Sequence, residues 1–242
     1  MSSLWLIVSG SGKDAPMRKP EKPARENISP SDLTFGLSTC KRCLWIKYWY
    51  KVTMPGAFPL VGTFASMQEE HFRGASMSEI HSSLRPGKVT KWGEWVKSKP
   101  LEVNGQITRW RILGKYDLVA QNDDGSVGLI DCKVSDSDRD NGEFYSPQLE
   151  AYAYSMENPA AGRGVTVASM GLLVWNPTHA IGEDTNSYGF GMAQKYLPVA
   201  RDQGNFLKVI GEFITVLEGD LPGAGPTCGT CNYLTQRLSL EN

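Results

Sequence analysis

Two short apolar runs joined by a turn stand out near the middle of the chain. The first spans 114–119 and contains one acid, and the second spans 127–134 and is apolar except at Asp131 and Lys133. The residues between them, 122–125, read Asn-Asp-Asp-Gly. Asp-Gly flanked by apolar runs is a strong signal for a β-hairpin. The pattern therefore predicts two neighbouring strands connected by a tight turn.

Further elements are predicted on both sides of this hairpin. A proline in the first turn, followed by good helix formers, predicts a helix from Ser146 to Met156. The other expected helices are one that follows an N-cap at 29–32 and runs through the first cysteines, a second over 58–73, and a third over 205–217. Strands are expected over 88–103, 107–113 and 165–175, and a loop over 184–192.

Composition is consistent with one domain of ordinary size. The chain has 242 residues, of which 40% are hydrophobic, so it can bury a substantial core. The polar, proline-punctuated start predicts a flexible lead-in over 1–27, and we expect the domain to span 28–242. The apolar run at 4–8 is too short for a membrane span or a signal core. We therefore expect no membrane partner and a cytoplasmic location (the host cytoplasm if the gene belongs to a phage).

The polar residues of the predicted hairpin carry the first candidate chemistry. Strand periodicity places Asp131 and Lys133 on the same face of the sheet, and Asp117 can lie beside them on the neighbouring strand. Two carboxylates and an ammonium suit a divalent cation and a water molecule. The alternative is a solvated sheet face with a cross-strand ion pair, which is common.

The predicted helix that follows adds two polar groups. Gln148 and Tyr152 are four residues apart and so share one helix face. The alternative is an ordinary amphipathic helix with Tyr152 half in the core. In this order, Asp117, the Asp-Cys-Lys triplet at 131–133 and the Gln-x-x-x-Tyr pair resemble the PD-(D/E)XK nuclease superfamily. The resemblance covers 28–233 and is strongest to the RecB-like branch, which includes CRISPR adaptation nucleases.

The resemblance implies an α/β fold in which a central mixed sheet is flanked by helices, as in restriction endonucleases. It implies Mg²⁺ or Mn²⁺ held by Asp117, Asp131 and the carbonyl of Cys132, with Lys133 positioning the attacking water. Gln148 and Tyr152 are implied as supports for the lysine and for the DNA backbone. A helix over 58–73 is implied to bring one more ligand to the metal. We favour Glu70, with Gln68 and His71 as rivals; the alternative for each is a solvated surface position.

Four of the five cysteines form two Cys-x-x-Cys pairs, at Cys40 and Cys43 and at Cys228 and Cys231. This is the pattern of a four-thiolate metal site, here clamping the two ends of the chain together. The alternatives are redox or disulfide cysteines, or two unrelated pairs. Spacing favours Zn²⁺. The resemblance instead implies a 4Fe-4S cluster, although the family usually places one cysteine before the core and three after it. Our hypothesis for these cysteines is the 4Fe-4S cluster, with Zn²⁺ as the alternative.

The charge balance excludes a global basic field, because 25 Lys and Arg face 26 Asp and Glu. Basic and aromatic residues nevertheless alternate over 41–51 and 88–99, which suits a single-stranded nucleic acid. The alternative is a charged face whose aromatic rings pack inward. The resemblance implies a metal-dependent DNA exonuclease acting on single strands or ends. The competing hypotheses are an inactive DNA- or partner-binding module on the same fold, and a structural zinc protein. No protein partner can be predicted.

Overall fold

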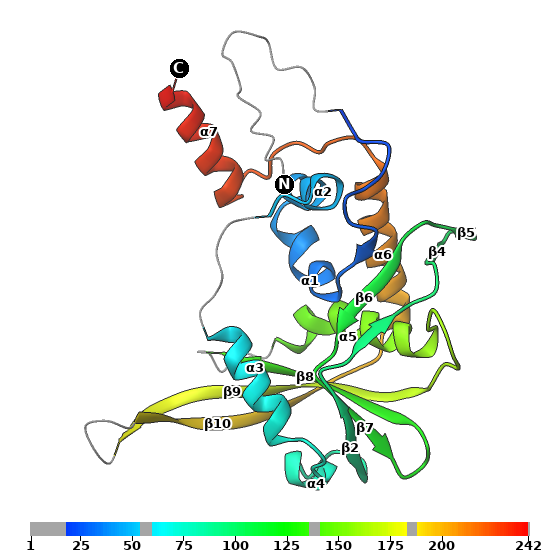
Figure 1. The fold of residues 1–242 in the computed structure, drawn as a ribbon, viewed down its shortest axis with the longest axis vertical. Coiled ribbons are helices and arrows are strands. Elements are labelled where there is room, and N and C mark those ends of the chain that lie inside the picture. Colours follow the sequence, from blue (N-terminus) through cyan, green and yellow to red (C-terminus); the bar gives the residue numbers. More distant parts are fainter. Residues whose placement is uncertain (1–17, 54–59, 136–140, 183–187, 242) are drawn as a thin grey trace, which may run out of the picture.

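The computed structural model describes residues 18–53, 60–135, 141–182 and 188–241, and Figure 1 shows how their elements are arranged. The helices are α1 (Pro30–Thr39), α2 (Lys41–Tyr50), α3 (Val61–His71), α4 (Met77–Ile80), α5 (Gly142–Glu157), α6 (Gln203–Glu218) and α7 (Gly229–Glu241). The strands are β1 (Asn27–Ile28), β2 (Gly87–Trp92), β3 (Trp95–Lys97), β4 (Glu102–Val103), β5 (Gln106–Ile107), β6 (Arg111–Lys115), β7 (Leu118–Asn122), β8 (Val127–Val134), β9 (Val167–Gly182) and β10 (Tyr188–Val199).

The strands form a mixed central sheet with smaller sheets beside it. The five-stranded sheet has the order β10-β9-β8-β7-β2, in which β8 and β9 are parallel and the other pairs antiparallel. A three-stranded sheet, β1-β6-β3, continues from it, because β6 leads directly into β7. Helices pack against the sheets, so the expected fold class of a mixed sheet flanked by helices is confirmed (Figure 1).

Two apolar layers hold the five-stranded sheet in place. On one face, Leu149 and Met156 of α5 pack against Leu129 of β8. On the other face, Phe72 and Met77, from the end of α3 and from α4, lie in the cluster that contains the next residue of β8, Ile130. Neighbouring residues of β8 therefore face opposite layers, as strand geometry requires. The site described below lies on the α5 side of β8.

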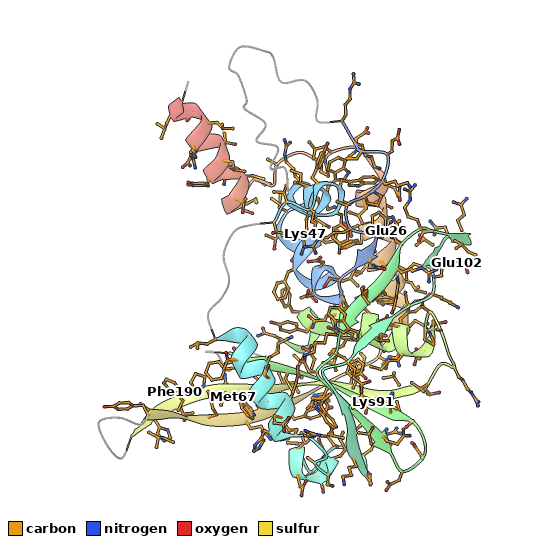
Figure 2. All side chains as sticks on the ribbon, in the orientation of Figure 1. Glu26, Lys47, Met67, Lys91, Glu102 and Phe190 are labelled. Atoms are coloured by element: carbon orange, nitrogen blue, oxygen red, sulfur yellow. The ribbon has the colours of Figure 1, made fainter. Side chains whose placement is uncertain are left out.

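A third apolar cluster joins α1, α2 and α6 to β6, and it buries the aromatic residues of α2. Trp45, Tyr48 and Trp49 of α2 are buried, and the indole of Trp49 donates to the carbonyl of Leu217 at 2.7 Å. The aromatic rings within 41–51 therefore pack inward, and the inward alternative is the correct interpretation of that segment. Figure 2 shows Lys47 of α2 in this upper layer, where its ammonium lies 2.5 Å from Asp32.

The predicted hairpin and the flanking helices are present, and other elements differ from the expectation. The strand expected over 88–103 is divided into β2, β3 and β4, and a bend at Asp117 interrupts the strand expected over 114–119. The hairpin joins β7 to β8, with Gly125 at φ +84 in its turn. The prediction of a single helix after 29–32 is wrong, because the extended backbone of Cys40 (φ −167) separates α1 from α2. α5 begins at Gly142 instead of Ser146, with proline inside the helix.

A further difference is the loop expected over 184–192. The prediction is wrong for the second half of this segment, because Tyr188 already pairs with Gly182 at the start of β10. Strands β9 and β10 form a long arm that projects from the sheet, and Figure 2 shows Phe190 toward its far end. An exposed arm needs no buried apolar face, so its strands carry glycine and polar residues that sequence patterns assign to loops.

Part of the expected lead-in lies within the described residues and contacts the helical layer. The ammonium of Lys19 lies 2.5 Å from the carbonyl oxygen of Glu218, and β1 pairs in parallel with β6. The apolar run at 4–8 lies outside the described residues. Among the helices that the structure describes, none is long and apolar enough to span a membrane.

Candidate functional site

The two candidate acids lie where the three-stranded sheet meets the five-stranded sheet. Asp117 occupies the bend between β6 and β7, and its Oδ2 accepts the backbone N–H of Cys132 at 2.6 Å. Asp131 is buried on β8, with 3% of its surface exposed. Its Oδ1 accepts a hydrogen bond from Nε2 of Gln148 at 2.8 Å, and its Oδ2 lies 2.5 Å from Nζ of Lys133. The structure thus brings these five residues together.

Residues of α5 and β6 support this arrangement. The ammonium of Lys133 lies 4.9 Å from the ring centroid of Tyr145, within cation–π range. The hydroxyl of Tyr152 donates to the carbonyl of Lys115 at 2.7 Å, which ties α5 to the strand that leads into Asp117. Tyr152 therefore contacts the backbone beside the acids and lies in the core between α5 and the sheet.

Burial raises the pKa of both acids. Burial first, and then the charge of Asp131, raise the pKa of Asp117 from 3.8 to about 7. Burial also raises the pKa of Asp131, although Lys133 and Gln148 oppose the shift. Burial disfavours the ammonium of Lys133, but the neighbouring carboxylates outweigh it and raise the lysine pKa. Lys133 is therefore protonated at neutral pH, and the two acids, when both are ionised, carry more negative charge than this one ammonium neutralises.

This charge imbalance fits a divalent cation, which prefers oxygen ligands. The carbonyl of Cys132 can join the carboxylates as a third ligand. The N–H and C=O groups of one strand residue point to the same side of the strand. Because the N–H of Cys132 reaches Asp117, its carbonyl also points toward that side. Cys132 lies two residues beyond the last β7–β8 pair, which joins Leu118 to Ile130. The thiol itself faces the opposite layer and lies in its apolar cluster.

Helix α3 does not direct Glu70, the residue favoured from the sequence, toward the site, but it does bring other residues there. Glu70 points outward, with 67% of its side chain exposed and Arg73 as its ion-pair partner. This exposed position contradicts the prediction of Glu70 as a metal ligand. Gln68 is buried and donates to the carbonyl of Lys133 at 3.3 Å. Glu69, whose side chain is 12% exposed, contributes to raising the pKa of Asp117.

Three residues beside the acids were not predicted from the sequence to be part of the site: Tyr145, Glu69 and Lys115. Tyr145 lies three residues before Gln148, so the helical spacing that joins Gln148 to Tyr152 could have extended to it. Glu69 pairs with the ammonium of Lys115 at 3.2 Å, a contact between elements 46 residues apart in sequence. No local pattern predicts which face of α3 turns toward the sheet, because packing decides it.

The four cysteines of the two pairs form a second cluster at the other end of the molecule. Their sulfur atoms all lie within 4.8 Å of one another. Cys43 lies 3.6 Å from Cys231 and 3.7 Å from Cys228, and Cys40 lies 3.8 Å from Cys231. All four are free thiols. The segments before α2 and at the start of α7 are thus brought together, as the spacing predicts, and the four sulfurs are close enough to hold a metal.

Backbone N–H groups favour the thiolate form of Cys40. Burial alone would raise the pKa of Cys40, but backbone N–H groups of Cys43 and Gly225 outweigh it and lower the pKa to about 6. The N–H of Cys231 also donates to the sulfur of Cys228 at 3.5 Å. Burial and the neighbouring thiols raise the pKa of Cys43. A bound cation would relieve that crowding, since thiolates are the form that binds metal.

Comparison with known proteins gives one family. The family model described as the PD-(D/E)XK nuclease superfamily matches residues 40–235, a span that contains both the acidic site and the four cysteines. No curated protein matches the chain significantly. Among solved structures, one titled "Crystal structure of SSO0001" is similar at 15% identity and a TM-score of 0.46, covering 85% of this chain and 82% of that chain.

Proposed function

The chain belongs to the PD-(D/E)XK nuclease superfamily, and we propose that it is a metal-dependent deoxyribonuclease. We propose that it hydrolyses the phosphodiester bonds of single-stranded DNA or of DNA ends as an exonuclease. The observation that carries the proposal is the buried contact between Asp131, Lys133 and Gln148 beside Asp117. A purely structural ion pair would not need a second buried carboxylate with a raised pKa next to it.

In this proposal Asp117, Asp131 and the carbonyl of Cys132 hold Mg²⁺ or Mn²⁺. A cation held there would polarise the scissile phosphate and lower the pKa of a water molecule. The backbone N–H of Cys132 orients the Asp117 carboxylate, and Gln148 orients that of Asp131. Both acids are thus fixed before a cation arrives, which reduces the cost of ordering them.

Lys133 acts as a positive charge in this site. Its raised pKa keeps it protonated, so it can orient the attacking water or stabilise negative charge that develops on the phosphate. The ring of Tyr145 and the carboxylate of Asp131 hold the ammonium in place. A general-base role for the free amine is less suited to this environment, because two carboxylates favour the charged form.

The test is degradation of DNA labelled at the 5′ or the 3′ end, as single strands, blunt duplexes and closed circles, with Mg²⁺ or Mn²⁺. An exonuclease shortens linear strands progressively from one labelled end and spares circles. Asp131→Asn should abolish cleavage with little change in side-chain volume. Asp123→Asn, on the exposed hairpin turn, is the matched control. DNA binding without cleavage by the wild type would instead support an inactive binding module.

For the four cysteines we propose one tetrahedral metal ion, with Zn²⁺ as the natural occupant. A tetrahedral ion with Zn–S bonds of about 2.3 Å separates its sulfurs by about 3.8 Å. The distances of 3.6, 3.7 and 3.8 Å fit that value. In a 4Fe-4S cluster each cysteine binds a different iron, so the cluster itself holds the sulfurs apart, beyond the 4.8 Å seen here.

Metal analysis of protein purified without oxygen separates the two alternatives. One zinc per chain, without iron and without visible absorbance, is the expected result. About four irons per chain with a broad absorbance near 400 nm would overturn the single-ion proposal. Because folding and metal binding are coupled, removal of the ion by a chelator should also lower the melting temperature. Cys132→Ser, outside the cluster, should leave the metal content unchanged.

A further inference from the structure

We propose that the exposed face of β3 and β6 is the path along which single-stranded DNA reaches the acids. In this inference Trp95 stacks on a base, and Lys97 and Lys115 contact phosphates. It rests on the proposed nuclease function and names the substrate contacts of that same site. Three observations carry it: the exposure of Trp95, the register that aligns it with the lysines, and the position of Lys115 two residues before Asp117.

Trp95 is exposed although it lies on a regular strand. Among the tryptophans that the structure describes, it alone is exposed, at 68% of its surface. Its neighbour Val96 packs against the core that contains α5, so the strand is firmly anchored and Trp95 must face the other way. A large aromatic ring held on a rigid strand can stack on a base with little loss of conformational entropy.

The pairing of β3 with β6 places basic residues on the same face. Trp95 is directly opposite Lys115, and Lys97 is opposite Leu113. Residues directly opposite each other in an antiparallel pair point to the same face. Lys97 is two residues after Trp95, so their Cα atoms are about 6.6 Å apart along the strand. The exposed face therefore carries one aromatic ring between two ammonium groups.

The opposite face of the same strands is closed, which leaves only this side for a ligand. A Cβ atom on Gly114 would lie 2.6 Å from Pro30 of α1 and 2.8 Å from Tyr152 of α5. Gly114 is opposite Val96, so both point toward these helices. β6 runs from the helical layer down to the five-stranded sheet, where it reaches the acids (Figure 1).

Lys115 connects this face to the acidic site. Its ammonium lies 3.2 Å from Glu69, and the charge of Glu69 in turn acts on Asp117. Asp117 is only two residues further along the chain. In this path the DNA strand contacts Lys115, which is opposite Trp95, on its way to the carboxylates. The lysines also offset the negative charge of the acids, which would otherwise repel DNA.

A single strand fits this surface better than a duplex. Stacking on Trp95 requires an unpaired base, because the bases of a duplex are stacked on one another. We therefore expect Trp95→Ala to weaken binding of a labelled oligothymidine by about 5- to 160-fold, which corresponds to about 1–3 kcal/mol of base–aromatic stacking. Trp95→Phe should retain most of the affinity. Phe190→Ala, which removes an exposed aromatic ring far along the β9–β10 arm, is the matched control (Figure 2).

The experiment is fluorescence anisotropy of the labelled oligothymidine and of a blunt duplex, without added divalent metal, at several salt concentrations. Lys97→Ala should reduce the slope of log Kd against log salt by about 0.7, the value for one phosphate contact on a single strand. Lys208→Ala, an exposed lysine of α6, should leave the slope unchanged.

The outcomes separate this inference from the proposed function. Unchanged oligothymidine binding by Trp95→Ala, while the wild type binds and cleaves, would overturn the path and leave the nuclease intact. An equal loss on the blunt duplex would overturn base stacking. If the wild type neither binds nor cleaves DNA, the proposed function fails first, and the face of Trp95 would then be a surface for another kind of partner.

Discussion

The buried acid pair predicts that metal binding weakens as the pH falls below 7. Burial and the charge of Asp131 raise the pKa of Asp117 to about 7, so much of the metal-free protein carries a proton there at neutral pH. A cation that binds this carboxylate must displace the proton. The apparent Kd for Mn²⁺ should therefore rise about tenfold for each pH unit below 7, or about 100-fold from pH 7 to pH 5.

The same shift sets the pH dependence of stability without metal. The folded-state pKa of Asp117 lies above its ordinary value of 3.8, so the folded protein binds this proton more tightly than the unfolded chain. The contribution is fully present below about pH 4 and is lost as the pH rises through about 7. Its full size is about 4 kcal/mol, at about 1.4 kcal/mol per pH unit. Added Mn²⁺ should restore the lost stability above pH 7.

Titration calorimetry with Mn²⁺ at pH 5, 6, 7 and 8, in buffers of different ionisation enthalpy, measures both the affinity and the protons released. We expect about one proton released per cation at pH 6 and almost none at pH 8. Asp131→Asn removes one of the proposed ligands and should weaken Mn²⁺ binding at every pH. An affinity that stays constant from pH 5 to pH 8, with no proton release, would refute a protonated Asp117.

Three further predictions concern the scaffold. Arg201→Ala removes the partner of the buried carboxylate of Glu150 and should cost about 3–5 kcal/mol of unfolding free energy in urea, with exposed Arg163→Ala as the control. Tyr152→Phe removes a hydrogen bond to a backbone carbonyl of β6 and should cost about 1 kcal/mol in the same assay. Phe213→Ala opens a cavity in the cluster between α2 and α6 and should cost about 3–5 kcal/mol.

Local chemistry made the centre of the fold predictable. The turn at 122–125 and the apolar strand that follows it determine the β7–β8 hairpin within about 15 residues. Strand periodicity then places Asp131 and Lys133 on one face, and helical spacing does the same for Gln148 and Tyr152. These residues meet because α5 packs on the face to which both carboxylate and ammonium point.

Contacts between distant elements were not predictable. The rotation of α3, which turns Glu69 toward Lys115 and Glu70 toward solvent, depends on how its end packs against the sheet. The break at Cys40 brings that thiol against Cys231, 191 residues away. Basic and aromatic residues alternate in both α2 and the β2–β3 region, and only the packing of α6 buries the rings of α2 while Trp95 stays exposed.

The role of Lys133 is tested by the single-turnover rate of cleavage of a labelled single strand at saturating Mn²⁺, compared between wild type, Lys133→Ala and Asp123→Asn. We expect a loss of about 100-fold or more for Lys133→Ala, the effect of removing a group that stabilises developing charge, and no change for Asp123→Asn. A Lys133→Ala rate within about threefold of wild type would contradict a site built on Asp117, Asp131 and Lys133.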